Sequence, residues 1–171
     1  MLFTVDDLCL SYLNNFIWFD RVKEKNPDFR IVAFTIANYK NNEPLLESTT
    51  FKDWFEKHKD WVEIAVHSYD HEGLPDGDRD DEKYWIEKAF EGLRFFLPKR
   101  YGYRSPGWQT TNKTVNILKD LGFSYIAYEG KVRDLKKDEI IETNVFNSHL
   151  YDVESIKKLG GVKNEISKNI S

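Results

Sequence analysis

Residues 61–71 read Trp-Val-Glu-Ile-Ala-Val-His-Ser-Tyr-Asp-His, a short apolar run followed at once by two histidines four residues apart. The run Val62–Val66 is rich in β-branched residues, which predicts a buried strand. The whole chain has four histidines, and His67 and His71 are two of them. In parallel α/β folds the loops after the strand C-termini form the functional sites, so this stretch predicts both a fold class and the place of a site.

Two further apolar runs end in the same way. Leu2–Val5 is followed by Asp6 and Asp7, and the mostly apolar residues 144–148 are followed by His149. Divalent metals that activate water bind imidazole nitrogens and carboxylate oxygens and keep one position open. The three strand ends together therefore predict the site of a metal-dependent hydrolase. Two histidines at this spacing can share one ion if their segment forms a turn of helix.

The adjacent carboxylates Asp6 and Asp7 allow two interpretations. On an extended chain their side chains point to opposite faces, but at a strand end that turns into a loop both can enter one cavity. One would then bind the ion, and the other would stay free as a base. Alternatively, the pair caps the N-terminus of a helix predicted over Leu8–Lys25, which aspartates also favour. The two interpretations are compatible.

Predicted helices and strands alternate along the chain. We expect helices at Leu8–Lys25, about Thr50–Lys59, Asp81–Phe96, Asn112–Leu121 and Val153–Leu159. We expect further strands at Ile31–Ala37, Tyr101–Arg104, Ser124–Tyr128, Ile140–Ile141 and Val145–Phe146. This order is typical of an α/β fold with a mainly parallel sheet and outer helices. With six to seven strands, an irregular or incomplete (β/α) barrel fits at least as well as an open sheet.

Length and composition set further bounds. At 171 residues we expect a single domain over 1–171, with 160–171 as a peripheral tail. Hydrophobic residues make up 40%, which supports a sizeable core. A net charge of −4 and a pI near 5.6 argue against a dedicated nucleic-acid binder. Cys9 is alone, so it forms no internal disulfide, and we expect it in the core.

The chain shows neither a signal peptide nor an apolar stretch near the roughly 18–20 residues of a membrane span. We expect a cytoplasmic protein if the chain is complete, and an extracellular or cell-envelope protein if an export leader is missing from it. The oligomeric state is open. His58 lies among charged residues, and we expect it to face solvent without a functional role.

The chain resembles the NodB-homology polysaccharide deacetylases of carbohydrate esterase family 4. The first family motif, T-F/Y-D-D, matches Thr4-Val5-Asp6-Asp7, and the second, H-S/T-x-x-H, matches His67-Ser68-Tyr69-Asp70-His71. The third, R-x-P, matches Arg104-Ser105-Pro106, with Trp108 just beyond, and the late histidine motif matches His149. The motifs occur in family order over positions 4–149.

The resemblance implies a role for each of these residues. Asp7, His67 and His71 would hold a divalent metal, usually zinc and sometimes cobalt or nickel. Asp6 would be the general base, and Arg104 would pair with it and keep it ionised. His149 would be the general acid that protonates the leaving amine.

The loop after Arg104 would bind substrate in the family pattern. A backbone N–H near Gly107 would stabilise the oxyanion, Pro106 belongs to the same motif, and Trp108 would form a wall of the sugar groove. The chain departs from the pattern at three points. Leu8 replaces a glycine, Asn147 replaces a leucine, and the fourth motif is not evident, although Glu129 and Asp134 lie in the right part of the chain.

The resemblance therefore implies a metal-dependent enzyme that removes N-acetyl groups, and less readily O-acetyl groups, from an amino-sugar polymer or glycoconjugate. Two alternatives stay open. A hydrolase of another C–N bond, in a cyclic amide or a formyl-amino sugar, fits the polar Asn147. A carbohydrate-binding domain with weakened catalysis fits the missing fourth motif.

Overall fold

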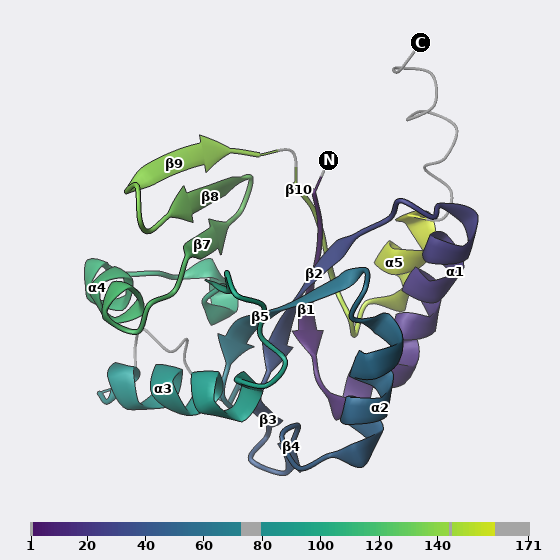
Figure 1. Ribbon diagram of the computed structural model, residues 1–171, viewed down its shortest axis with the longest axis horizontal. Coiled ribbons are helices and arrows are strands. Elements are labelled where there is room, and N and C mark those ends of the chain that lie inside the picture. The colour runs from purple at the N-terminus through teal and green to yellow at the C-terminus, as the bar shows by residue number, and fades with distance from the viewer. Residues whose placement is uncertain (1, 73–79, 144, 160–171) are drawn as a thin grey trace.

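A curled eight-stranded sheet forms the centre of the computed structural model, which describes residues 2–72, 80–143 and 145–159 (Figure 1). The strand order is β10-β1-β2-β5-β6-β7-β8-β9. Neighbours from β10 to β7 pair in parallel, whereas β7, β8 and β9 form an antiparallel meander. The strands are β1 Leu2–Leu8, β2 Ile31–Ile36, β5 Val62–Ser68, β6 Gly102–Tyr103, β7 Tyr125–Tyr128, β8 Lys131–Asp134, β9 Glu139–Glu142 and β10 Val145–His149. A separate hairpin pairs β3 (Asn38–Tyr39) with β4 (Glu43–Pro44).

The helices lie outside the curled sheet. In Figure 1, α1, α2 and α5 lie on the right of the sheet, and α3 and α4 lie on the left. Their bounds are α1 Ile17–Lys25, α2 Thr49–His58, α3 Glu82–Leu93, α4 Asn112–Asp120 and α5 Val153–Leu159, with 3-10 turns η1 at Leu10–Phe16 and η3 at Pro106–Trp108. Within the described ranges, β9 and β10 are the two edges of the sheet and do not pair. The predicted incomplete (β/α) barrel with outer helices is therefore confirmed.

Side chains on each strand alternate between two apolar clusters, as a period of two requires. Ile31 and Ala33 of β2 face the main core under the helices, whereas Phe34 belongs to a small cluster with Ala65 and Ala127. The small cluster lies on the inside of the curled sheet, where Phe34 and Ala127 also line a pocket of about 260 Å³. On β2 and β5, residues two positions from Phe34 or Ala65 therefore also face the barrel interior. The same alternation on the other strands determines which side chains meet at the site.

Local capping sets the helix starts, in places one or two residues from the predicted ones. Ser48 rather than Thr50 caps α2, because its hydroxyl accepts a hydrogen bond from the N–H of Phe51 at 3.1 Å. Thr111 rather than Asn112 caps α4 and forms a capping box with Thr114. Gly122 follows α4 with a φ of 79°, the left-handed conformation in which a glycine commonly ends a helix. Strand β8 is an element that the sequence analysis did not predict.

The predicted helix over Leu8–Lys25 is wrong at its start. Strand β1 continues through Leu8, which pairs with Thr35 of β2, and a 3-10 turn precedes α1. Both Leu8 and Cys9 are fully buried, so the sheet rather than a helix takes this segment. The predicted N-cap role of the two aspartates is wrong as well, since they lie within the strand. The core position predicted for Cys9 is confirmed.

His58 corrects another prediction, because it is buried rather than solvent-facing. Only 2% of it is exposed, and its ring stacks on Trp54 with centroids 4.6 Å apart. Its Nε2 lies 2.8 Å from Oδ1 of Asp20, and its Nδ1 lies 2.5 Å from the carbonyl oxygen of Trp54. The imidazole thus joins the end of α2 to α1.

The segment 73–78, which the sequence predicts to be a loop, and the whole of the tail predicted at 160–171 lie outside the described residues. Among the described helices, none has both the length and the hydropathy that crossing a membrane requires.

Gly102 in β6 tests the packing that carries the site. A Cβ at Gly102 would lie 2.0 Å from Cε2 of Tyr125, inside the sheet next to Arg104. We expect Gly102→Ala to lower the free energy of unfolding by about 2–3 kcal/mol, as overpacking does. Urea denaturation measures the change. The control Gly130→Ala adds a Cβ in open space and suffers mainly from its φ of 68°, about 1 kcal/mol. A Gly102→Ala variant as stable as this control would contradict the close packing.

Candidate metal centre

The pairing of β1 with β10 brings the first and last parts of the site together. In the register Thr4 lies beside Asn147 and Asp6 lies beside His149. Each pair is two residues from the next along its strand, so all four side chains face the barrel interior. Residues about 140 positions apart in the chain thus become neighbours at the carboxyl ends of two adjacent parallel strands.

A bulge lets Asp6 and Asp7 enter the same site. The register between β1 and β2 shifts between Val5 and Leu8, and Asp7 has a φ of 66°. On a regular strand Asp7 would point away from Asp6, but the left-handed backbone redirects it. Aspartate adopts this conformation more readily than most residues. The left-handed bulge conformation that a glycine commonly supplies is therefore supplied here by Asp7 itself.

The two histidines of the 67–71 segment meet at a strand end and not on a helical turn. His67 is on β5, whereas His71 lies three residues beyond the strand end with a φ of 56°. The Nδ1–H of His67 donates to the carbonyl oxygen of Arg104 at 2.8 Å, since that oxygen can only accept. This bond fixes the ring and leaves Nε2 facing Asp7. Metal-binding histidines are commonly oriented by such a second bond.

Asp7, His67 and His71 form a set that fits a divalent metal. One ligand atom from each lies within 4.8 Å of the others. Oδ1 of Asp7 is 3.6 Å from Nε2 of His67 and 3.2 Å from Nε2 of His71. The donor set of two imidazoles and one carboxylate suits zinc and similar ions and leaves room for another ligand. The predicted ligands are thus brought together, although these distances do not identify a metal.

The charges within this set shift its protonation. Burial raises the pKa of Asp7, but the hydrogen bond from His149 and the contact with His67 outweigh burial and hold that pKa well below its usual range. Burial lowers the pKa of His67, yet Asp7, Asp6 and the Arg104 carbonyl raise it above its ordinary value. Burial and the neighbouring His67 lower the pKa of His71. In the metal-free set, His67 therefore takes up a proton before His71.

Asp6 does not belong to this set and instead pairs with Arg104. Oδ1 of Asp6 lies 2.5 Å from Nη1 of Arg104, and the two side chains are 1% and 0% exposed. The guanidinium is packed between Phe34 and Trp108, with its Cζ 3.9 Å and 4.2 Å from the ring centroids. The predicted pairing is present, and it holds a carboxylate beside the metal set.

His149 lies at the other side of Asp7. Its Nδ1–H donates to Oδ2 of Asp7 at 2.9 Å, and its ring stacks on Tyr151 with centroids 5.1 Å apart. The hydrogen bond to Asp7 raises the pKa of His149 above its usual value, with burial opposing it. The side chain is 38% exposed, so a substrate can reach it.

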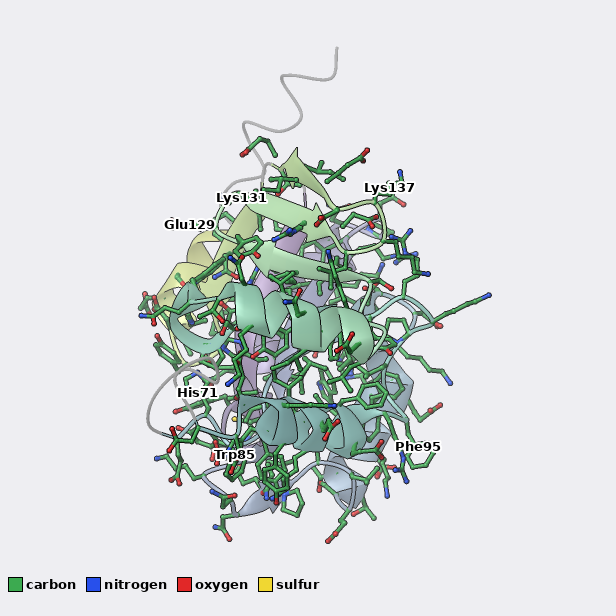
Figure 2. All side chains as sticks on the ribbon, turned by 90° about the vertical axis from the view of Figure 1, so that its left-hand side faces the viewer. His71, Trp85, Phe95, Glu129, Lys131 and Lys137 are labelled. Carbon is green, nitrogen blue, oxygen red and sulfur yellow. The ribbon has the colours of Figure 1, made fainter. Side chains whose placement is uncertain are left out.

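A pocket of about 470 Å³ opens beside His149. Its lining comes from η3, β10 and the β7–β8 turn, and the lining residues are Trp108, Glu129, Gly130, Val145, Phe146, Asn147 and His149. Figure 2 shows Glu129 and His71 on the left-hand side of the view, and Phe95 and Lys137 on the right. A hollow of about 520 Å³ includes Phe95 but lies at the amino ends of β2 and β5, away from the metal set. Of these two, the pocket of about 470 Å³ is the one that adjoins His149 and therefore the candidate site.

Comparison with solved structures agrees with this architecture. A CE4 family pseudoenzyme from Bacillus anthracis matches with a TM-score of 0.68 and 12% sequence identity, over 99% of this chain and 60% of that one. A mutant of the same pseudoenzyme matches with the same TM-score and identity over 62% of its length. The chain has a CE4 polysaccharide deacetylase-like fold. No protein-family model and no curated protein matches it. At 12% identity the likeness shows the CE4 fold alone, and the chain spans about 60% of those structures.

The remaining residues that the resemblance assigned to the site, Pro106, Gly107 and Trp108, form the 3-10 turn η3. Pro106 is buried, Gly107 is exposed and has a φ of 62°, and Trp108 has a φ of 63° that turns its ring over Arg104. Asp134 does not buttress Arg104, because it accepts from the N–H groups of a turn and pairs with Arg100 at 3.4 Å. Thr4 and Glu129 are site residues for which the sequence predicted no such place. Thr4 precedes Asp6 by two residues, so the alternation of a strand could have indicated that both side chains face the same side.

The metal set makes a binding prediction. We expect His67→Ala and Asp7→Asn each to weaken zinc binding by more than about 100-fold, because each removes a ligand. His149→Ala should weaken binding less, by about 10–100-fold, since His149 hydrogen-bonds the proposed ligand Asp7 without belonging to the set. Isothermal titration calorimetry measures the three affinities. Equal loss in all three variants would contradict the ligand assignment.

Zinc affinity should also depend on pH. The raised pKa of His67 means that this imidazole is protonated below and around pH 6.5, where the proton competes with the metal. We expect the affinity to rise by about tenfold per pH unit up to the folded-state pKa of His67 and to level off above it. Zinc titrations from about pH 5.5 to about pH 8.5, the range in which imidazoles titrate, measure how steeply the affinity depends on pH. A flat profile would show that His67 is not a ligand.

Proposed function

We propose that this protein is a metal-dependent hydrolase that removes N-acetyl groups, and less readily O-acetyl groups, from an amino-sugar polymer or glycoconjugate. One observation carries the proposal. A buried carboxylate, Asp6, is held by Arg104 beside the set of Asp7, His67 and His71 without joining it. A base next to a metal set is what hydrolysis by activated water requires, whereas a purely structural metal site needs no such base.

A bound divalent metal would lower the pKa of water and polarise the acyl carbonyl. Zinc suits the ligand set best, and cobalt and nickel are the other ions to test. Asp6 takes the proton from the attacking water. Arg104 supports this role because its contact with Oδ1 at 2.5 Å fixes the direction of the carboxylate. The bond from His67 to the Arg104 backbone ties the base and one ligand to the same loop.

His149 delivers a proton to the leaving amine nitrogen. Its Nδ1–H is held by Asp7, so Nε2 is the nitrogen that carries the transferable proton. The hydrogen bond to Asp7 raises the pKa of His149, which favours the protonated form that a general acid needs. The side chain also lines the 470 Å³ pocket, which supports its role as the acid toward a substrate bound there.

The pocket suits a sugar ring. Trp108 supplies an aromatic wall, and Glu129 supplies a carboxylate that can accept hydrogen bonds from hydroxyl groups. Gly107 is exposed beside Trp108, and its N–H would stabilise the oxyanion. These features support an acetylated carbohydrate as the substrate class.

The similarity to a pseudoenzyme makes turnover the point to test. That protein shares the fold with this chain, and its name says nothing about the residues present here. This chain carries both aspartates, the histidine pair, the arginine and the late histidine, and they converge as a working site would require. We therefore propose an active enzyme rather than a weakened carbohydrate-binding domain.

Two substitutions test the mechanism. We expect Asp6→Asn and His149→Ala each to lower kcat for acetate release from N-acetylated sugar oligomers by about 10²–10⁴-fold, because each removes a proton-transfer group. Acetate is measured with and without added zinc, on a panel that includes cyclic amides and formyl-amino sugars.

The control is Asp134→Asn, which changes a hydrogen-bonded carboxylate away from the metal set and should keep full activity. Full activity in both Asp6→Asn and His149→Ala would refute the mechanism. Turnover of cyclic amides alone would keep the mechanism and change the substrate class.

A further inference from the structure

The amide of Asn147 links three interior residues of the site. Its Nδ2 donates to Oδ2 of Asp6 at 3.0 Å. Its Oδ1 accepts from Nη1 of Arg104 at 2.9 Å and from the hydroxyl of Thr4 at 2.7 Å. Thr4 in turn accepts from the same Nη1 at 3.3 Å. Both ends of the amide are therefore engaged inside the protein and do not offer a polar wall to an acyl group.

The surroundings of Asn147 allow one orientation of its amide. On the Oδ1 side lie a guanidinium, which only donates, and a hydroxyl that can donate. On the Nδ2 side lies a carboxylate, which only accepts. A flipped amide would place its NH₂ against the guanidinium and its oxygen against the carboxylate of Asp6. The hydroxyl of Thr4 thus helps to determine which way the amide points.

Arg104 by itself fixes only half of the Asp6 carboxylate. Among the described residues, Nε and Nη2 of Arg104 have no hydrogen-bond partner, and its side-chain bonds to Asp6, Asn147 and Thr4 all come from Nη1. A bidentate pair would hold both carboxylate oxygens, but this pair holds Oδ1 alone. The second oxygen, Oδ2, is held by Asn147.

We propose that Asn147, with Thr4 behind it, is the positioning residue that sets the rotation of the Asp6 carboxylate. The inference rests on the proposed function, in which Asp6 is the base. With Oδ1 tied to Arg104 and Oδ2 tied to Asn147, the carboxylate has one orientation about its terminal torsion. Without Asn147 the carboxylate can turn about the Arg104 bond, toward or away from the metal set.

The test uses two replacements of Asn147 and one of Thr4. Asn147→Asp keeps the shape and the acceptor for Arg104 but removes the donor to Asp6, and Asn147→Leu removes both. We expect either change to lower kcat by about 10–100-fold, the cost of a misplaced group. KM and zinc affinity should each change by less than about threefold, because Asn147 touches no predicted ligand.

Thr4→Val should lower kcat several-fold alone and not at all in the Asn147→Leu background, since Thr4 acts through Asn147. The matched control is Thr35→Val, another buried strand threonine, whose hydroxyl donates to the carbonyl of Ala33 away from Asp6. Additive losses for Thr4 and Asn147 would overturn the proposal. A raised KM with kcat unchanged would also overturn it and would make Asn147 a residue that binds substrate.

Crystal structures of the zinc-loaded wild type and Asn147→Leu give a readout that needs no activity. We expect the Asp6 carboxylate to rotate in the variant while Arg104 stays in place. An unchanged carboxylate would overturn the inference. If the wild type turns over no acylated substrate, the proposed function fails, and this structural comparison alone decides whether Asn147 positions Asp6.

Discussion

The buried ion pair between Asp6 and Arg104 is the interaction on which the rest of the site depends. It joins the end of β1 to the segment after β6, and both side chains are almost completely removed from water. Burying two charges costs several kcal/mol per ion, roughly what their attraction returns, so such a pair seldom adds much net stability. Removing one partner is far more costly, because the other charge is left uncompensated. The main effect of the pair is therefore to hold the Asp6 carboxylate at a fixed position in the interior.

Backbone conformation is the second constraint. Asp7, His71 and Trp108 all have positive φ, and each follows or interrupts a different strand of the sheet. A non-glycine residue in the left-handed region costs about 1–2 kcal/mol, and it persists where surrounding contacts determine it. Here the three residues provide two predicted ligands and the ring that covers Arg104. The alternation of the strands brings Thr4, Asp6, Asn147 and His149 inward. The positive-φ backbone at Asp7, His71 and Trp108 directs these three side chains to the site as well.

The sequence allowed most strands of the main sheet and the outer helices to be predicted, because strand runs and helix periodicity are local features. It did not show that β1 extends through Leu8, since pairing with Thr35 is a contact between distant residues. His58 was mispredicted for the same reason. Its charged neighbours suggested solvent, whereas Asp20, 38 residues earlier, completes a buried contact. The role of Asn147 needed the parallel register with Thr4, which no local pattern contains. Because one fold can belong to both active and inactive proteins, the similarity to a pseudoenzyme does not determine whether this chain is active. The proposed activity rests on these residues.

The central claim is that Asp7, His67 and His71 hold a divalent metal while Asp6 stays off it. The most direct measurement is an anomalous difference map from zinc-soaked crystals of the wild-type protein, recorded at the zinc absorption edge. The account predicts one strong peak about 2.0–2.2 Å from Nε2 of both histidines and from an oxygen of Asp7, with Asp6 still bound to Arg104. A peak coordinated by Asp6 or His149 in place of these ligands, or no peak at this position, would contradict it.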